Sequence, residues 1–326
     1  AVPIAAAALV ALSTVAVLVL QPWSGGSGSG SDDGAKGGGT GAPSSPGPTG
    51  PAPFPTAPLL IRADPVLGVQ NCRSVIARRT PDSATPSGLT STDGCPSLPQ
   101  WSPDRRSFAY TRTTAQGSSV WTADADGSNP RRIIDVAGGR ASWSPDGKRL
   151  AVLRTKDGVQ QLFVVNVADG SAVQLTTGRG PVEDPAWSPD GKRIAVCLQA
   201  GKDGWQIHLV DPEAPGTAPQ QVTRLPHPAF DPMWSPDGRT FAYTGGTYGQ
   251  GTQGDIRLVG TDGTGDRALV STGEHEMDPA WSPDGGWLAF VRGPYEAPVI
   301  WAVRADGTDP RRLTPESLNE AHPGWR

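Results

Sequence analysis

The string Trp-Ser-Pro-Asp occurs five times in this chain of 326 residues, and four of the copies continue with Gly. The copies begin at Trp101, Trp143, Trp187, Trp234 and Trp281, and a sixth Trp stands at position 325. The intervals between these tryptophans are 42, 44, 47, 47 and 44 residues. A near-constant period in this range indicates a repeat protein in which each repeat is one supersecondary unit.

Each repeat reads as four β-strands. Ser-Pro-Asp-Gly has the residues that a type I turn prefers at each of its positions. After the turn that follows Trp143, apolar runs predict strands at Lys148–Arg154 and Gln160–Asn166, and a short fourth strand at Ala172–Thr176. Four strands per repeat predict a propeller blade. The repeat Trp then packs one blade against the next, and the Asp serves the turn instead of binding a metal.

The repeated Trp-Ser-Pro-Asp-Gly string, followed by an apolar strand, resembles the TolB-type propeller repeat, also called PD40. The five copies and the terminal half-copy cover roughly residues 60 to 326. This resemblance implies an all-β, TolB-like β-propeller. It is less specific for function, because the family includes the periplasmic protein TolB and the propeller domains of prolyl-oligopeptidase-like hydrolases. Resemblance to TolB implies protein docking in the envelope.

The length predicts six blades and a ring closed by its two ends. Residues 59–326 correspond to six repeats, of which five are complete. Trp325 and its neighbours would supply the innermost strand of the sixth blade, and Val66–Ser91 the outer strands, with Cys72–Arg79 the clearest candidate. Cys72 and Cys95 flank this region, and a disulfide between them would help to hold the ring shut in an oxidising compartment. Cys197 is expected to be a buried free thiol.

The first 58 residues predict an anchor and a linker. Residues 1–20 carry no charge and are long enough to span a bilayer, so we expect a transmembrane helix over residues 1–23, with Trp23 at the interface. A cleaved signal peptide is the alternative. Residues 24–58 are rich in Gly and Ser and then in Pro, and they predict a disordered linker. The propeller would then lie on the extracytoplasmic side of the cell membrane.

One position of the repeat is the candidate site. The residues three before each repeat Trp are, in order, Leu98, Arg140, Asp184, Asp231, Asp278 and His322. In a closed ring they would meet at one mouth of the central channel, where Asp184, Asp231, Asp278, His322 and Arg140 are the predicted ligand-binding residues. They suit a cation or a basic group of a peptide. The alternative is that each Asp before Pro only caps its own loop. We expect no cofactor. Hard cations such as calcium prefer such oxygen ligands, although three carboxylates around a wide channel are far apart for one ion.

Three of the four histidines fall in the same region of the repeat. His227, His275 and His322 all lie just before a repeat Trp, in the loop that enters the innermost strand, which predicts a place at the channel mouth. His208 falls in a third strand and is expected to be packed there.

Composition and motifs restrict the function. The net charge is −4 and no basic run is longer than two residues, which argues against a nucleic-acid partner. The sequence has no Gly-x-Ser-x-Gly elbow, P-loop or dinucleotide fingerprint. We therefore expect a monomeric, membrane-anchored, non-enzymatic module that binds a protein or peptide in the envelope. It could be the sensor part of a longer membrane protein such as a receptor-type kinase. The alternative is a propeller of, or accessory to, an envelope hydrolase, with the channel mouth as active site.

Overall fold

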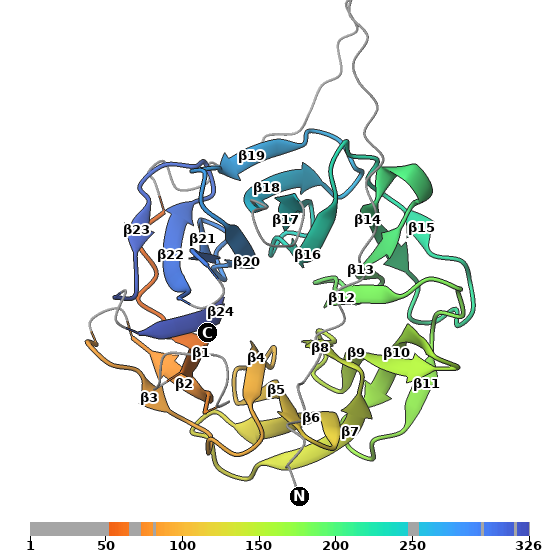
Figure 1. The fold of residues 1–326 in the computed structure, drawn as a ribbon, viewed down its shortest axis with the longest axis horizontal. Helices are drawn as coiled ribbons and strands as arrows, with labels where there is room; N and C mark the ends of the chain where they lie inside the picture. The colour runs from red at the N-terminus through yellow and green to blue at the C-terminus, as the bar shows by residue number, and fades with distance from the viewer. Residues whose placement is uncertain are drawn as a thin grey trace, which may run out of the picture. The chain divides into compact units, whose positions relative to one another are not determined.

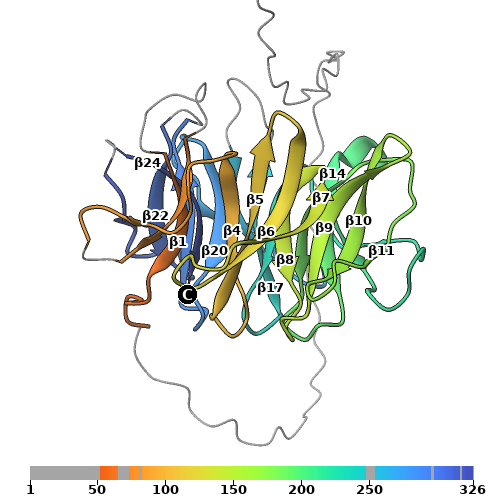
Figure 2. The same ribbon diagram turned by 90° about the horizontal axis from the view of Figure 1, so that it is seen from below.

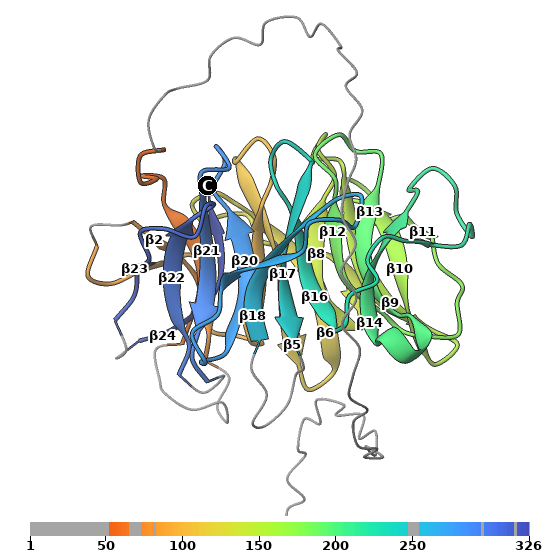
Figure 3. The ribbon, with the colours of Figure 1, turned by 90° about the horizontal axis from the view of Figure 1, so that it is seen from above.

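Six four-stranded antiparallel sheets surround a central axis and confirm the all-β, six-bladed propeller (Figure 1). The computed structural model describes residues 52–64, 73–80, 83–246, 254–294, 297–315 and 318–325. Seen edge-on, the strands of each blade run roughly along the axis of the ring (Figure 2, Figure 3).

Blades 1 to 5 each take their four strands in chain order from the centre outwards. Blade 1 holds β4 (Pro96–Trp101), β5 (Ser107–Thr114), β6 (Gly117–Asp124) and β7 (Arg131–Val136). Blade 2 holds β8 (Gly138–Trp143), β9 (Arg149–Lys156), β10 (Val159–Asn166) and β11 (Ala172–Gln174). Blade 3 holds β12 (Val182–Trp187), β13 (Ile194–Gln199), the 3-10 turn η2 (Gly201–Asp203), β14 (Trp205–Val210) and β15 (Gln220–Gln221). Blade 4 holds β16 (Ala229–Trp234), β17 (Thr240–Gly246), β18 (Gly254–Gly260) and β19 (Arg267–Val270). Blade 5 holds β20 (Glu276–Trp281), β21 (Trp287–Arg292), β22 (Val299–Arg304) and β23 (Arg311–Arg312).

The closing blade combines both ends of the described chain. Its order from the centre is β24 (Asn319–Trp325), β1 (Leu59–Asp64), β2 (Val75–Arg79) and β3 (Ser87–Gly88). β24 runs antiparallel to β1, with Trp325 opposite Leu59. The second strand therefore comes from before Val66, earlier than the sequence predicted, whereas β2 falls inside the expected Cys72–Arg79. A buried ion pair also joins β2 to β24, since Arg79 donates to both carboxylate oxygens of Glu320 at 2.5 and 2.6 Å.

The Ser-Pro-Asp turns are stabilised by their own side chains. In blade 2, the Ser144 hydroxyl donates to Asp146 at 2.5 Å and accepts the Arg149 N–H at 2.9 Å. Asp146 in turn accepts the Lys148 N–H at 3.1 Å. The hydrogen bond from Ser144 lowers the pKa of Asp146. The same Ser–Asp hydrogen bond occurs in the other four copies, so the Asp serves the turn.

The repeat tryptophans join neighbouring blades. Three of them donate the indole N–H to the carbonyl just before the Trp of the preceding blade: Trp143 to Gln100 at 3.2 Å, Trp234 to Ala186 at 3.0 Å and Trp281 to Met233 at 3.2 Å. Trp187 instead donates to Gly191 of its own turn at 3.2 Å. The Arg149 guanidinium of the preceding blade lies 5.0 Å from the centre of its ring.

The end of the predicted disordered linker is packed against the ring, so that expectation is wrong for residues 52–58. The ring of Phe54 lies 5.0 Å from that of Trp287 and 6.1 Å from that of Trp325, both edge-on. The Pro53 carbonyl accepts the Trp287 indole N–H at 2.9 Å. The reason is an aromatic surface between blade 5 and the closing blade, which can bury Phe54 and order the prolines around it. We call residues 52–58 the strap.

The N-terminal expectations concern residues that lie outside the described chain. Residues 1–51 are not described, so the transmembrane helix over residues 1–23 and the linker over residues 24–51 stay predictions. In the part of the chain from residue 52 that the structure describes, no helix is long and apolar enough to cross a membrane.

The three cysteines differ in what the structure says of them. Cys197 is a buried free thiol on β13, as expected. Cys95 is not a free thiol. Its predicted partner Cys72 lies outside the described residues, so the Cys72–Cys95 pairing stays a prediction.

Replacing Phe54 with Ala should destabilise the whole ring. We expect Phe54→Ala to lower the free energy of unfolding by about 2 kcal/mol, because it removes a half-buried aromatic ring from the closing interface. Urea unfolding of the two proteins measures the change. Thr56→Ala, an exposed position of the strap, is the control and should cost less than about 0.5 kcal/mol. Equal stability of Phe54→Ala and the wild type would mean that the strap does not support closure.

Candidate functional site

Each innermost strand is bulged where the candidate residues lie. In β12, β16 and β20 the pairing with the next strand skips two residues, an Asp and a Pro. Asp184, Asp231 and Asp278 have φ of 50°, 50° and 54°, and His322 in β24 has φ of 52°. Asp and His tolerate this left-handed region better than most residues, and Pro has no N–H to leave unpaired. Bulges redirect side chains, and here they do so on the strands that line the centre of the ring (Figure 1).

Arg140 reaches the same position by a different route. In β8 the positive φ belongs to the preceding Gly139, at 78°, and the pairing with β9 is interrupted from Gly138 to Ser142. Arg140 is therefore placed by a longer bulge than the aspartates are.

An ion pair crosses the central channel. Arg140 of blade 2 donates to Asp278 of blade 5 at 3.0 Å, and these blades face each other across the ring (Figure 1). Arg140 also contacts the Met233 sulfur at 3.3 Å. His322 Nδ1 lies 2.7 Å from the other Asp278 oxygen. The Arg140 and Asp278 side chains are only 10% and 9% exposed, so this trio lies inside the channel.

The surroundings of Asp278 keep its carboxylate ionised. Burial acts to raise the pKa of Asp278, but the charge and hydrogen bond of His322 and the charge of Arg140 outweigh it and lower the pKa to about 2. The negative charge of Asp278 is thus compensated by Arg140 and His322. We call Arg140, Asp278 and His322 the channel plug.

The other two aspartates form a separate acidic pair. The Asp231 N–H donates to the Asp184 carboxylate at 3.1 Å, and the Thr244 hydroxyl donates to Asp231 at 3.0 Å. Burial and the charges of Asp231 and Glu183 raise the pKa of Asp184 well above its usual range. Burial, and to a lesser extent Asp231, also raises the pKa of Glu183. The charge of Arg140 also acts to lower the pKa of Asp184, but burial and the two neighbouring carboxylates outweigh it. The three predicted acids therefore differ, because the pKa of Asp278 is lowered and that of Asp184 is raised.

The acidic pair lies against the buried thiol of Cys197. Burial and then the charges of Asp184, Asp231 and Glu183 raise the pKa of Cys197 well above its usual value. The thiol is therefore held in its protonated, unreactive form. Within the described residues, no three His, Cys, Asp or Glu side chains are grouped so that they could hold a metal ion.

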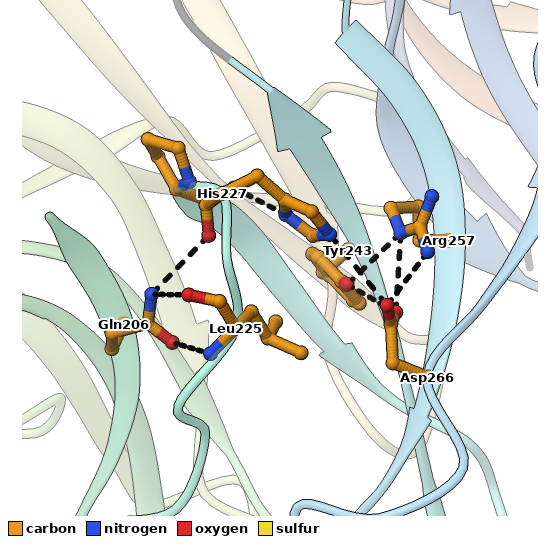
Figure 4. Close-up of polar contacts among 7 residues, drawn as sticks. Gln206, Leu225, His227, Tyr243, Arg257 and Asp266 are labelled. Carbon is orange, nitrogen blue, oxygen red and sulfur yellow. Dashed lines mark hydrogen bonds and ion pairs between the residues drawn. The ribbon is translucent and has the colours of Figure 1, made fainter. Parts of the chain in front are cut away.

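His227 does not join the channel residues, which corrects the expectation for three histidines. Its ring stacks on Tyr243 of β17, with ring centres 6.2 Å apart, and its Nε2 lies 3.6 Å from Asp266 (Figure 4). Arg257 donates to both Asp266 oxygens at 3.1 and 2.6 Å. The hydrogen bonds from Arg257 and Tyr243 outweigh burial and lower the pKa of Asp266.

Gln206 connects this group to blade 3. Its side-chain NH₂ donates to the Leu225 and His227 carbonyls, both at 3.2 Å, and its oxygen accepts the Leu225 N–H at 2.9 Å (Figure 4). The network therefore fixes the loop that enters β16, which is a structural role. His275 lies close enough to the plug for its charge to act on Asp278, and its Nδ1 accepts the Gly254 N–H at 2.9 Å. His208 is buried on β14, as expected.

Removing the carboxylate charges should stabilise the protein at the acidic pair and destabilise it at the channel plug. Asp184→Asn with Asp231→Asn keeps the hydrogen-bond acceptors and removes the repulsion, and should raise Tm by roughly 2–4 °C. Asp278→Asn removes one partner of a buried ion pair and should cost about 3 kcal/mol. Thermal and urea unfolding of the empty protein at pH 7 measure both. Shifts in the same direction for both variants would contradict this division of the ring.

Acid should weaken the plug before the rest of the ring. The pKa of Asp278 is about 2 in the folded protein and lies near 3.8 when unperturbed, so its stabilisation is present above pH 4 and is lost as pH falls from 4 to 2. The loss should amount to about 2 kcal/mol. Urea unfolding at pH 5 and pH 2 measures it, with Asp278→Asn as the control that lacks this contribution. An equal drop in both proteins would assign the acid sensitivity to other groups.

Comparison with known proteins supports the fold. The model of the PD40 family, described as the TolB beta propeller domain, matches residues 81–326. The Tol-Pal system protein TolB of Xylella fastidiosa (strain M12) is 36% identical over 75 residues, which cover 21% of this chain and 17% of the relative. TolB of Xanthomonas campestris pv. campestris (strain B100) is 33% identical over 79 residues, covering 22% and 18%. The matched segment is thus less than a fifth of either relative.

Solved structures show the same architecture. The crystal structure of TolB from Acinetobacter baumannii superimposes with a TM-score of 0.69 at 18% identity, over 82% of this chain and 66% of that one. A chain of the nidogen/laminin complex gives a TM-score of 0.61 at 11% identity, over 82% and 97%. At such identities the likeness concerns the fold alone. With the family model covering most of the chain, the protein belongs to the PD40 family of TolB β-propeller domains.

Proposed function

We propose that this protein is a non-enzymatic binding module that docks a protein or peptide of the cell envelope through the channel of its propeller. The TolB relatives are named as proteins of the Tol-Pal system, and this chain shares their propeller. The relatives are much longer than the matched segment, so what carries over is the propeller as a docking surface. A monomer suits this role, because the ring is closed by its own two ends.

The observation that carries the proposal is the pair of aspartates held on adjacent bulged strands of the channel, where the Asp231 N–H donates to Asp184 at 3.1 Å and the pKa of Asp184 is raised. Burial, Asp231 and Glu183 all make its ionised form costly in the empty protein. A cationic group placed near Asp184 and Asp231 would offset the part of that cost that comes from the neighbouring carboxylates, and would favour the ionised form. An N-terminal amine, a Lys or an Arg of a peptide has the required charge.

The channel plug lies next to this acidic pair and is held by its own ion pair. Arg140 is held by Asp278 across the ring, so its charge is already compensated and would not repel a cationic ligand strongly. The raised pKa of Cys197 leaves that thiol without nucleophilic character, which favours binding over covalent catalysis.

The N-terminal segment supports a membrane location. Its first 20 residues carry no charge, as a spanning helix requires. An anchored propeller on the extracytoplasmic side would serve as a docking or sensor module, including that of a receptor-type kinase. Fractionation of cells that express the full chain tests the anchor, and recovery of the uncut protein in the soluble fraction would contradict it.

Calorimetric titration with short peptides tests the docking site. The probes are Lys-containing peptides with a free amino terminus and the same peptides acetylated and lacking Lys. Binding of the basic peptides should fall with salt, and Asp184→Asn with Asp231→Asn should weaken it at least about tenfold. Asp157→Asn removes an exposed carboxylate elsewhere and is the matched control.

Two outcomes would count against the channel as the binding site. One is that the neutral peptides bind as well as the basic ones. The other is that the channel double variant and Asp157→Asn behave alike.

A further inference from the structure

Two open grooves lie between blades at the same place in the repeat. Groove 4/5, between blades 4 and 5, has a volume of about 710 Å³, and Thr240, Gly260, Arg267, Trp281 and Ala305 are among its lining residues. Groove 1/2, between blades 1 and 2, has a volume of about 480 Å³, and Ser107, Asp124, Arg131, Trp143 and Val167 line it at the corresponding positions.

The interface between blade 5 and the closing blade has the same four anchoring positions. Trp287 follows Trp281 by six residues, as Thr240 follows Trp234. Trp287 pairs with Arg304 across the strands, as Thr240 pairs with Gly260. The outer strand opens with Arg311 here and with Arg267 in blade 4, and the next repeat Trp is Trp325 here and Trp281 there.

At this interface the four positions hold a peptide, namely the strap. The indole N–H of Trp287 and the guanidinium of Arg304 donate to the Pro53 and Ala52 carbonyls. The ring of Phe54 lies edge-on to Trp287 and Trp325, and the Arg311 guanidinium lies 4.8 Å from its centre. The strap thus shows what this position of the repeat can bind: one aromatic ring between two Trp and an Arg, with prolines on both sides.

We infer that groove 4/5 is a second docking site, which binds a proline-flanked aromatic segment of a partner protein in an extended conformation. The aromatic ring would lie against Trp281 and under the Arg267 guanidinium, as Phe54 lies against Trp325 and under Arg311. Prolines suit the site because they pre-set an extended backbone and add no N–H groups to satisfy.

Side-chain size explains why groove 4/5 is open. Thr240 and Gly260 stand where the closing interface has Trp287 and Arg304, and Ala305 and Gly265 add no bulk. Arg267 is exposed and donates to the Ala305 carbonyl at 3.2 Å, which holds its guanidinium over the groove. Groove 1/2 is smaller and has Asp124 in place of Arg304, so it fits the strap chemistry less well.

The test uses the full chain and the strap itself as the probe. An acetylated and amidated peptide of residues 52–58, Ala-Pro-Phe-Pro-Thr-Ala-Pro, is titrated into the wild type by calorimetry. We expect saturable binding that is lost when the Phe of the peptide is replaced by Ala. Ala305→Trp fills groove 4/5 and should weaken binding at least about tenfold, whereas the matched Val167→Trp in groove 1/2 should leave it unchanged.

Two further variants keep the test decisive. Arg267→Ala should also weaken binding, with Arg131→Ala as its counterpart in groove 1/2, so the result does not depend on the folding of Ala305→Trp. The full-chain Phe54→Ala variant removes the ring of the strap but leaves the hydrogen bonds to the Ala52 and Pro53 carbonyls. The peptide should displace this weakened strap and raise the Tm of the variant. This shows that the probe reproduces the strap.

The outcomes separate this site from the channel. Asp184→Asn with Asp231→Asn should not change binding of the strap peptide. The proposal for groove 4/5 can therefore hold even if the proposed docking in the channel is wrong. No binding to the wild type, or equal binding to Ala305→Trp and Arg267→Ala, overturns the proposal. Concentration-dependent dimerisation that Phe54→Ala abolishes would assign the groove to the strap of a second copy, and would overturn it too.

Discussion

The packing of a repeat tryptophan against the preceding blade is the contact on which the ring depends. In three interfaces the indole N–H binds the backbone carbonyl next to the previous Trp, so these innermost strands are placed relative to the ones before them. This brings six bulged strands around one axis. Because the innermost strands surround one narrow axis, Arg140 of blade 2 can reach Asp278 of blade 5 across the channel.

The bulges create one position of the repeat at which the type of residue is not restricted by strand pairing. A residue with positive φ next to a proline contributes little to the ladder, and neighbouring pairs on either side hold it in place. Unfavourable backbone and buried charge persist at such places because the surrounding structure supports them. Three blades carry Asp at this position and the other three carry Leu, Arg and His. Arg140 and His322 compensate Asp278, whereas Asp184 and Asp231 lie beside each other.

The closing interface shows a second use of the repeat. The anchoring positions that hold Phe54 recur between blades 4 and 5 and between blades 1 and 2, where smaller side chains leave them open. One surface of the ring therefore serves both to complete the fold and, as we infer, to bind a segment from outside.

The sequence by itself determined the fold class, the number of blades, the turn chemistry and the position of the repeat that faces the centre. Those features depend on contiguous residues and on a fixed period, which a single chain displays directly. It missed β1 as the second strand of the closing blade, the docking of Phe54 and the place of His227. It also grouped Asp278 with Asp184 and Asp231. Only the tertiary structure decided these points, because they depend on which blades face each other, how far Arg140 and Phe54 reach, and which charges burial brings together.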